Sequence, residues 1–215
     1  MSTVVVLDYG TSNLRSVAKA LEYIAENKHK VIVSDQADEI LSADRVVFPG
    51  QGAIGQCMES LKDKKLDEVL IKCLESKPFL GICLGLQTLM NSSDEDGGTE
   101  GLGVVSGNVV RFQNNMQDKQ GRVCKIPHMG WNTVCHRQDH PLWQGIAIDT
   151  RFYFVHSYYV CPDNPADIAA TTCYTVEFTS AVAKSNIFAV QFHPEKSQQG
   201  GLTLLKNFLE WNGNV

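Results

Sequence analysis

The 215-residue sequence lacks the features that mark several common classes of protein. Its formal net charge is -5, and no block of lysine and arginine offsets that charge. Nucleic-acid binding is therefore not expected, because proteins that bind a phosphate backbone present basic patches. There is also no internal repeat, low-complexity segment or interdomain linker. The length suits one α/β domain, and we expect residues 1–215 to form it.

The N-terminus lacks a basic segment ahead of its first apolar run, which Asp8 ends. That run is too short for a secretory signal or a membrane-spanning helix. The seven cysteines include no CxxC pair, which indicates reduced thiols rather than a disulfide framework. The cysteines and histidines of residues 124–140 also lack the spacing of a zinc site. We expect a cytoplasmic protein with no metal, no cofactor and no membrane contact.

What the first half does contain is an alternation of strand-like and helical patterns. Apolar runs predict strands over residues 4–8, 31–33, 45–48 and 79–82. Helical spacing predicts helices over residues 14–24, 37–41, 61–74 and 84–90, the first with an N-cap among residues 10–13. This order predicts a mostly parallel twisted sheet flanked by helices.

The second half carries shorter β-like runs separated by turns. They cover residues 109–112, 133–135, 152–155, 168–172, 178–183 and 187–191. We expect them to add partly antiparallel strands to the same sheet. A last helix over residues 202–211 has one apolar stripe.

A nucleophile candidate lies between a predicted strand and a predicted helix. Gly81, Cys83 and Gly85 match the pattern G-x-nucleophile-x-G, in which larger side chains would collide with the adjacent strand and helix. The helix would offer its N-terminus to the thiolate, and the N–H of Leu84 would point toward an oxyanion. Taken alone, the pattern fits a buried structural cysteine as well.

His193 and Glu195 flank Pro194 at the end of the last apolar run. Residues two apart in an extended chain point to the same side, about 6.6 Å apart, so Glu195 can orient the ring of His193. Both this motif and Cys83 follow the end of a predicted strand, where α/β folds place ligand sites. By itself the motif also fits a solvated surface turn. Together the two motifs predict a Cys-His-Glu triad.

Gly50, Gly52 and Gly55 provide a rival interpretation, because they satisfy the dinucleotide fingerprint G-x-G-x-x-G. That fingerprint expects an acidic residue at the end of the next strand, where this sequence has Cys83. The first strand–helix turn, residues 8–13, contains Gly10 but also lacks the glycine pattern of the fingerprint. A nucleotide-binding module stays an alternative to a loop that offers a backbone N–H to an oxyanion, and so does a plain structural turn.

Three segments in this order resemble the class I (triad) glutamine amidotransferases: PGQG at 49–52, GICLGLQ at 81–87 and FHPEKS at 192–197. Within that family, residues 8–14, 127–132 and 153–158 look like the glutaminase subunits of imidazole glycerol phosphate synthase, an enzyme of histidine biosynthesis. The resemblance implies a glutaminase that releases ammonia. An amidotransferase subunit of another synthase, such as anthranilate synthase, and a stand-alone cysteine hydrolase remain alternatives.

The resemblance also implies roles for single residues. It makes Cys83 the nucleophile, His193 the base and then the acid, and Glu195 the residue that orients His193. It assigns an oxyanion hole to the N–H groups of Gly52 and Leu84. It implies contacts with the substrate L-glutamine from Gln87, Glu95, Ser157 and Tyr158. Gln51 departs from the pattern, because many relatives have a small apolar residue there.

A partner protein is implied as well. After Ser197 only one helix is expected, so we expect the ammonia acceptor on another polypeptide. The resemblance implies a heterodimer with a (β/α)8-barrel cyclase subunit that activates the glutaminase when loaded with its ligand. The residues implied to face that partner are Pro127, His128, Met129, Trp131, Asn132 and Lys196. His156 is expected to be structural or to lie at the interface.

Overall fold

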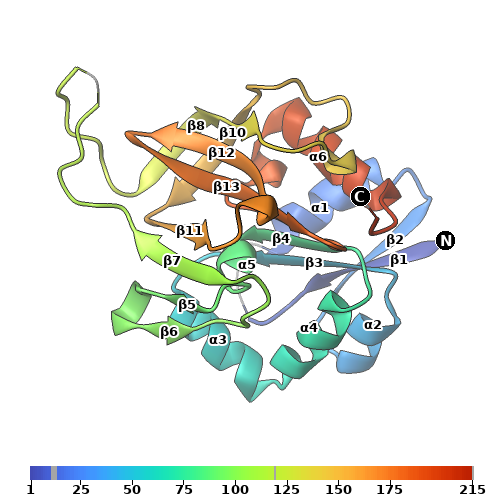
Figure 1. The fold of residues 1–215 in the computed structure, drawn as a ribbon. Helices are drawn as coiled ribbons and strands as arrows, with labels where there is room; N and C mark the ends of the chain where they lie inside the picture. The colour runs from blue at the N-terminus through green and yellow to red at the C-terminus, as the bar shows by residue number, and fades with distance from the viewer. Residues whose placement is uncertain (11–13, 119, 215) are drawn as a thin grey trace.

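The computed structural model describes residues 1–10, 14–118 and 120–214. In that part of the chain, twelve strands form one mixed sheet (Figure 1). Its parallel half has the order β2-β1-β3-β4-β14. These strands are β1 (Ser2–Leu7), β2 (His29–Ser34), β3 (Arg45–Gly50), β4 (Phe79–Cys83) and β14 (Ile187–Val190). All four predicted strands of the first half are confirmed.

The other half of the sheet is mainly antiparallel, as the sequence predicts. From β14 it continues through β13, β11, β7, β5 and β6, while β12 pairs with β13 and with β9. These strands are β13 (Val176–Lys184), β12 (Ile168–Tyr174), β11 (Tyr158–Pro162), β9 (Cys135–His136), β7 (Gly107–Arg111), β6 (Thr99–Glu100) and β5 (Ser92–Ser93). Two strands leave this arrangement: β8 (His128–Thr133) and β10 (Arg151–His156) form a separate antiparallel pair. The prediction that the run 152–155 joins the main sheet is therefore wrong, and β8 was not predicted, because the run expected in this region covers only residues 133–135.

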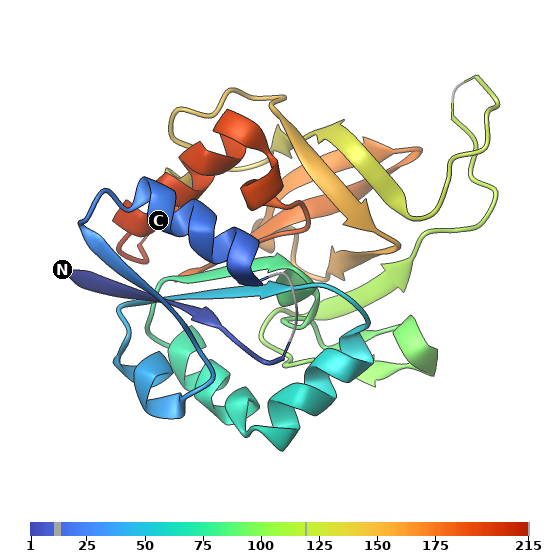
Figure 2. The ribbon, with the colours of Figure 1, turned by 180° about the vertical axis from the view of Figure 1, so that it is seen from behind.

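Helices cover both faces of the parallel half (Figure 2). On one face lie α1 (Leu14–Ile24) and α6 (Gln198–Glu210), whose apolar sides join a core with Val4, Val6 and Leu80. On the other face lie α2 (Ala37–Ser42), α3 (Ile54–Asp63) and α4 (Leu66–Leu74). Because both faces are covered, Val4 to Leu7 is a continuous buried run rather than an alternating one.

Three helices differ from the sequence-based prediction. The last one, expected over residues 202–211, is α6 and begins four residues earlier, at Gln198. The helix expected over residues 61–74 is two helices, because Lys65 between them adopts the left-handed conformation with φ 55°. The helix expected over residues 84–90 is only α5 (Leu84–Gln87). The N-cap expected among residues 10–13 falls on residues outside the described part of the chain, apart from Gly10. The described residues also form four 3-10 turns: η1 (Glu95–Gly97), η2 (Pro141–Trp143), η3 (Pro165–Asp167) and η4 (Pro194–Lys196).

The sheet brings the predicted motifs to one edge. Gly50 at the end of β3 lies opposite Cys83 at the end of β4. Ile82 in β4 lies opposite Val190, three residues before His193. The carboxyl ends of three adjacent parallel strands thus meet, which is where α/β sheets bind ligands. In the described part of the chain, none of the helices has the length and apolar character to cross a membrane.

Candidate active site

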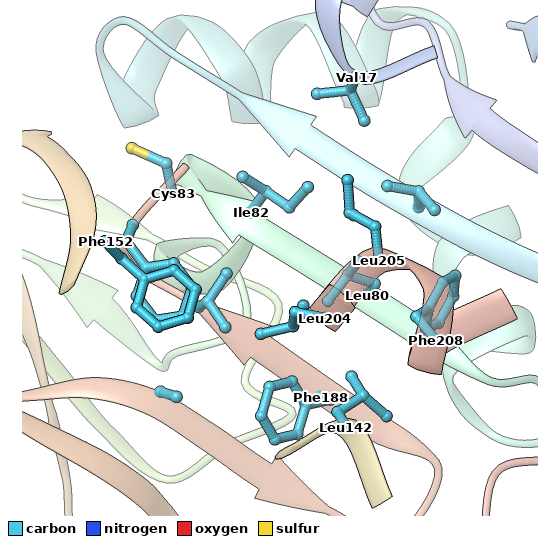
Figure 3. Close-up of a cluster of buried hydrophobic side chains, with 14 of the residues drawn as sticks. Val17, Leu80, Ile82, Cys83, Leu142, Phe152, Phe188, Leu204, Leu205 and Phe208 are labelled. Carbon is cyan, nitrogen blue, oxygen red and sulfur yellow. The ribbon is translucent and has the colours of Figure 1, made fainter. Parts of the chain in front are cut away.

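Cys83 occupies a strained turn between β4 and α5. Its backbone has φ 55° and ψ -105°, a conformation that residues with a side chain rarely adopt. The side chain is 7% exposed. In Figure 3, Cys83 lies at the margin of a hydrophobic cluster, and its sulfur points away from Leu80 and Leu205. The turn therefore presents the sulfur at the end of the strand, as the elbow pattern predicts.

The two glycines of this turn are required by contacts with neighbouring strands. A Cβ on Gly85 would lie 1.9 Å from the carbonyl oxygen of Phe48 in β3. A Cβ on Gly81 would lie 2.7 Å from the carbonyl oxygen of Gly85 and 2.9 Å from Cβ of Ala189 in β14. The sequence-based argument that side chains would collide here is confirmed.

His193 and Glu195 form the expected pair. Nδ1 of His193 lies 2.9 Å from Oε1 of Glu195, and the two side chains are 2% and 0% exposed. Glu195 lies in η4, and His193 is the residue that immediately precedes this turn, so one turn fixes both groups. Nδ1–H therefore donates to the carboxylate, and Nε2 is the ring nitrogen that remains available for proton transfer. Nε2 is buried and has no hydrogen-bond partner of standard geometry within the described residues.

The charges around His193 favour its protonated form. Burial alone would lower its pKa, but the Cys83 thiolate and the Glu195 carboxylate more than compensate and raise the pKa to about 10. His193 is therefore an imidazolium at neutral pH when Cys83 is a thiolate. An imidazolium beside a thiolate is the charged pair that a cysteine–histidine nucleophile uses for attack.

A cavity of about 670 Å³ opens over Cys83. Its lining residues come from loops at the carboxyl ends of the parallel strands and from the β10–β11 connection. They are Gly10, Gln51, Gly52, Cys83, Leu84, Gln87, Glu95, Pro127, Val155, His156, Ser157, Tyr158 and His193. The structure thus collects all the predicted oxyanion and substrate-binding residues around the nucleophile.

The loop after β3 approaches Cys83 through Gly52. Gly52 has φ +100°, which favours glycine, and nothing within 4 Å of a built Cβ blocks a side chain there. Its conformation, rather than crowding, therefore selects glycine. Leu84 is the first residue of α5, so its N–H is one of those left free at a helix start. Both residues line the same cavity, as an oxyanion hole requires.

Gln87 lines the cavity and belongs to a hydrogen-bond network that the sequence analysis missed in part. Nε2 of Gln87 donates to the carbonyl oxygen of Tyr158 and to Oε1 of Gln191, both at 3.2 Å. Gln191 is fully buried, and its Nε2 lies 3.6 Å from the sulfur of Cys83. Its signal in the sequence is a single polar residue in the apolar run 187–192, two residues before His193 and hence on the same side.

Glu95 has an additional structural contact. Its Oε2 accepts a 2.9 Å hydrogen bond from the N–H of Ile54, the first residue of α3. Burial raises the pKa of Glu95, while that hydrogen bond works in the opposite direction. A carboxylate at the start of α3 also occupies the place where a dinucleotide fingerprint would hold a pyrophosphate. This arrangement argues against the nucleotide-binding interpretation of Gly50, Gly52 and Gly55.

Most residues expected to face a partner lie at the surface. Pro127 and Lys196 are exposed, Asn132 is partly exposed, and Met129 and Trp131 are 62% and 36% exposed. His128 differs, because its ring is only 3% exposed and stacks on Phe154 and Tyr174. The side chain of His128 therefore points inward from β8, and it contributes to the interior rather than to the exposed surface.

His128 and His156 form a buried chain of hydrogen bonds. Nδ1 of His128 lies 2.9 Å from Nε2 of His156, whose own Nδ1 lies 2.7 Å from the carbonyl oxygen of Tyr158. Because that carbonyl only accepts, His156 donates from Nδ1 and accepts from His128. Burial lowers the pKa of His128 to about 4 and that of His156 to about 3, so both rings are neutral. This neutrality separates them from His193 and argues that His156 is structural.

Among the residues that the structure describes, no group of three or more His, Cys, Asp or Glu side chains is placed to hold a metal ion. All seven cysteines are free thiols.

Comparison with known proteins agrees with this geometry. The family model described as glutamine amidotransferase class-I matches residues 5–211. The chain is 53% identical to the imidazole glycerol phosphate synthase subunit HisH of Methylococcus capsulatus, covering 98% of this chain and 97% of that one. It is 54% identical to the subunit of the same name from Aromatoleum aromaticum, covering 98% and 99%.

Solved structures of lower sequence identity share the fold. A glutamine amidotransferase from Thermotoga maritima superposes with a TM-score of 0.68 at 16% identity, covering 97% of this chain and 96% of that chain. A second solved glutamine amidotransferase gives a TM-score of 0.71 at 18% identity, covering 96% and 97%. With the family model spanning nearly all of the sequence, the chain belongs to the class I glutamine amidotransferase family.

Proposed function

We propose that this chain is the glutaminase subunit of an imidazole glycerol phosphate synthase and supplies ammonia to a cyclase subunit in histidine biosynthesis. The observation that carries the proposal is the identity of 53% and 54%, over nearly the whole length, to proteins that bear this name. The cavity supports it, because Cys83 and His193 share its lining with polar groups suited to a small amide substrate.

In the first half of the proposed reaction, the Cys83 thiolate attacks the δ-carbonyl carbon of glutamine. The N–H groups of Gly52 and Leu84 stabilise the oxyanion of the tetrahedral intermediate. His193, protonated beside the thiolate, gives its proton to the leaving nitrogen. Ammonia departs, and a γ-glutamyl thioester remains on Cys83.

In the second half of the proposed reaction His193 must act as a base, and the loss of a neighbouring charge makes this possible. Acylation removes the negative charge of Cys83, which is one of the causes that raise the pKa of His193. With burial still lowering that pKa, the ring loses its proton more readily. A neutral His193 then takes a proton from water as the water oxygen attacks the thioester. Glutamate leaves, and the thiolate–imidazolium pair is restored.

The ammonia is proposed to pass to a (β/α)8-barrel cyclase subunit in a heterodimer. The partner could contact the exposed apolar side chains of Met129 and Trp131 and the exposed cation of Lys196. Pro127, in the same segment as Met129, lines the cavity. We propose Gln87, Glu95, Ser157 and Tyr158 as the groups that hold glutamine in that cavity.

The test is glutamate release from glutamine by the purified chain, alone and with the cyclase subunit carrying a ribonucleotide ligand. We expect strong activation by the loaded partner, and loss of activity in Cys83→Ala. Cys161→Ala is the matched control, because Cys161 is an exposed thiol in β11 that the mechanism does not use. High activity that ignores the partner would indicate an autonomous hydrolase. Inactivity with the partner would point to another synthase.

A further inference from the structure

Gln191 is a buried polar residue to which the proposed reaction assigns no role. It follows β14 and is 0% exposed, and it is not among the described residues that line the cavity. Its backbone N–H donates to the carbonyl oxygen of Ser180 in β13, so the sheet fixes its main chain. A fully buried amide side chain requires hydrogen-bond partners, and its partners are Cys83 and Gln87.

The orientation of this amide follows from one backbone carbonyl. The carbonyl oxygen of Tyr158 can only accept, so Gln87 must turn its NH2 group toward it. The second hydrogen of that NH2 group points to Gln191, which must therefore present its oxygen to Gln87. The NH2 group of Gln191 is then left facing the sulfur of Cys83, at 3.6 Å. The alternative orientation would place two acceptors against each other.

We infer that Gln191 donates a hydrogen bond to the Cys83 thiolate and thereby stabilises and positions the nucleophile. The inference rests on the proposed glutaminase function and adds a group to its site. Cys83 is buried at 7% exposure, so few water molecules reach its charge, and a hydrogen bond to a buried anion is stronger than one between neutral groups. The thiolate thus has His193 as its counter-ion and Gln191 as its hydrogen-bond donor.

Two substitutions at this position separate donor and charge effects. Gln191→Met removes the donor at similar side-chain volume. Gln191→Glu keeps the shape but replaces the donor by an oxygen that repels the thiolate. Ser180→Ala is the matched control, because it removes a fully buried hydroxyl next to Gln191 that has no hydrogen-bond partner among the described residues. Thermal unfolding of each variant establishes that it folds.

The first readout is the rate at which iodoacetamide alkylates Cys83 between pH 5 and 10, followed by mass spectrometry of the peptide that contains Cys83. We expect the midpoint of this profile to rise by roughly one to two pH units in Gln191→Met and further in Gln191→Glu. It should stay unchanged in Ser180→Ala. An unchanged midpoint in folded Gln191→Met overturns the inference.

The second readout is glutaminase activity with the loaded partner. We expect kcat/KM of Gln191→Met to fall roughly 10- to 100-fold near neutral pH and to recover as the pH rises, with KM little changed. A purely structural role would lower activity equally at all pH values, which would contradict the inference. If Gln191→Met does not fold, the inference is tested with Gln87→Met, which removes the group that orients Gln191. This variant should raise the alkylation midpoint by a smaller amount, and an unchanged midpoint would overturn the inference. Alkylation of Cys83 needs neither glutamine nor the partner, so the alkylation result tests the role of Gln191 independently of the proposed glutaminase function.

Discussion

Nδ1 of His193 lies 2.9 Å from Oε1 of Glu195, and solvent reaches neither side chain to any extent. A buried carboxylate next to an imidazole favours the charged ring and fixes its orientation. Nε2 is thereby directed away from Glu195 and is free to exchange protons with the Cys83 sulfur, with ammonia and with water. The pair therefore determines both the protonation state and the direction of the catalytic base.

Replacing Glu195 by Gln should keep the shape of the site but remove this charge. The pKa of His193 should fall, and less of the protonated acid should be present when ammonia leaves. We expect kcat/KM for glutamine to drop by roughly 100-fold or more, measured with the loaded partner. Glu59→Gln, on the exposed side of α3, serves as the control and should retain activity. Wild-type turnover in Glu195→Gln would remove Glu195 from the mechanism.

The Cys83 thiolate should be visible in the titration of His193. We expect NMR of the wild-type imidazole to give a pKa of about 10. In Cys83→Ala the thiolate is gone while burial still disfavours the charge, so the pKa should move down by at least one unit. The same value in both proteins would show that the thiolate and His193 do not interact.

Acid should destabilise the fold through three buried neutral histidines. Burial lowers the pKa of His128 and His140 to about 4 and that of His156 to about 3. The unfolded chain takes up protons at these sites below about pH 6.5, whereas the folded chain does not. Their contribution to stability is therefore complete above pH 6.5 and is lost as the pH falls toward 4. Each of them lowers the free energy of unfolding by about 1.4 kcal/mol per pH unit in that window.

Urea unfolding at pH 7.5, 6 and 5 measures this loss. His193 behaves in the opposite way, because its raised pKa stabilises the fold below pH 6.5 and the contribution disappears only as the pH rises toward 10. Stability that stays constant from pH 7.5 to 5 would contradict the buried, neutral state of His128, His140 and His156.

Gly85→Ala should disrupt the elbow. The new Cβ would lie 1.9 Å from the carbonyl oxygen of Phe48, and backbone atoms cannot yield as a side chain can. We expect the free energy of unfolding to fall by about 3 kcal/mol and glutaminase activity to disappear with the displaced nucleophile. The control is Gly55→Ala in α3, where the nearest atom is the end of the Asp96 side chain at 3.1 Å. Equal stability of the two variants would contradict the packing argument.

Trp131→Ala should weaken binding of the cyclase subunit. Trp131 is 36% exposed on β8. Its ring lies edge-on to the ring of Tyr153, with the two ring centroids 6.2 Å apart, so this large apolar group is already held in place. We expect Kd, measured by calorimetry, to rise by roughly 30-fold. Tyr23→Ala is the control, since Tyr23 is 77% exposed on α1. An unchanged Kd for Trp131→Ala would place the interface elsewhere.

Local patterns predicted the triad because each motif is contained within a few residues. Cys83 is marked by its glycines, and His193 by the glutamate two positions on. The role of Gln191 could not be predicted in the same way, because its partners are 104 and 108 residues away in sequence. Only the pairing of β14 with β4 brings them together.

The parts of the fold that were predicted wrongly also depend on tertiary contacts. The break at Lys65 carries no glycine or proline, and apolar residues continue on both sides of it. The burial of His128 arises from stacking on Phe154 and Tyr174, which are distant in sequence. The separate β8–β10 pair has the same strand-like composition as the main sheet, so composition could not distinguish them.

β14 lies between β4 and β13, and within the described residues it is followed by η4 and α6. During synthesis, the segment with Cys83 therefore emerges long before the strand that must settle beside it. Until that late strand is inserted, the cysteine has neither a base, nor a carboxylate behind the base, nor the amide donor beneath it. The catalytic groups are therefore brought together only when this late strand completes the sheet.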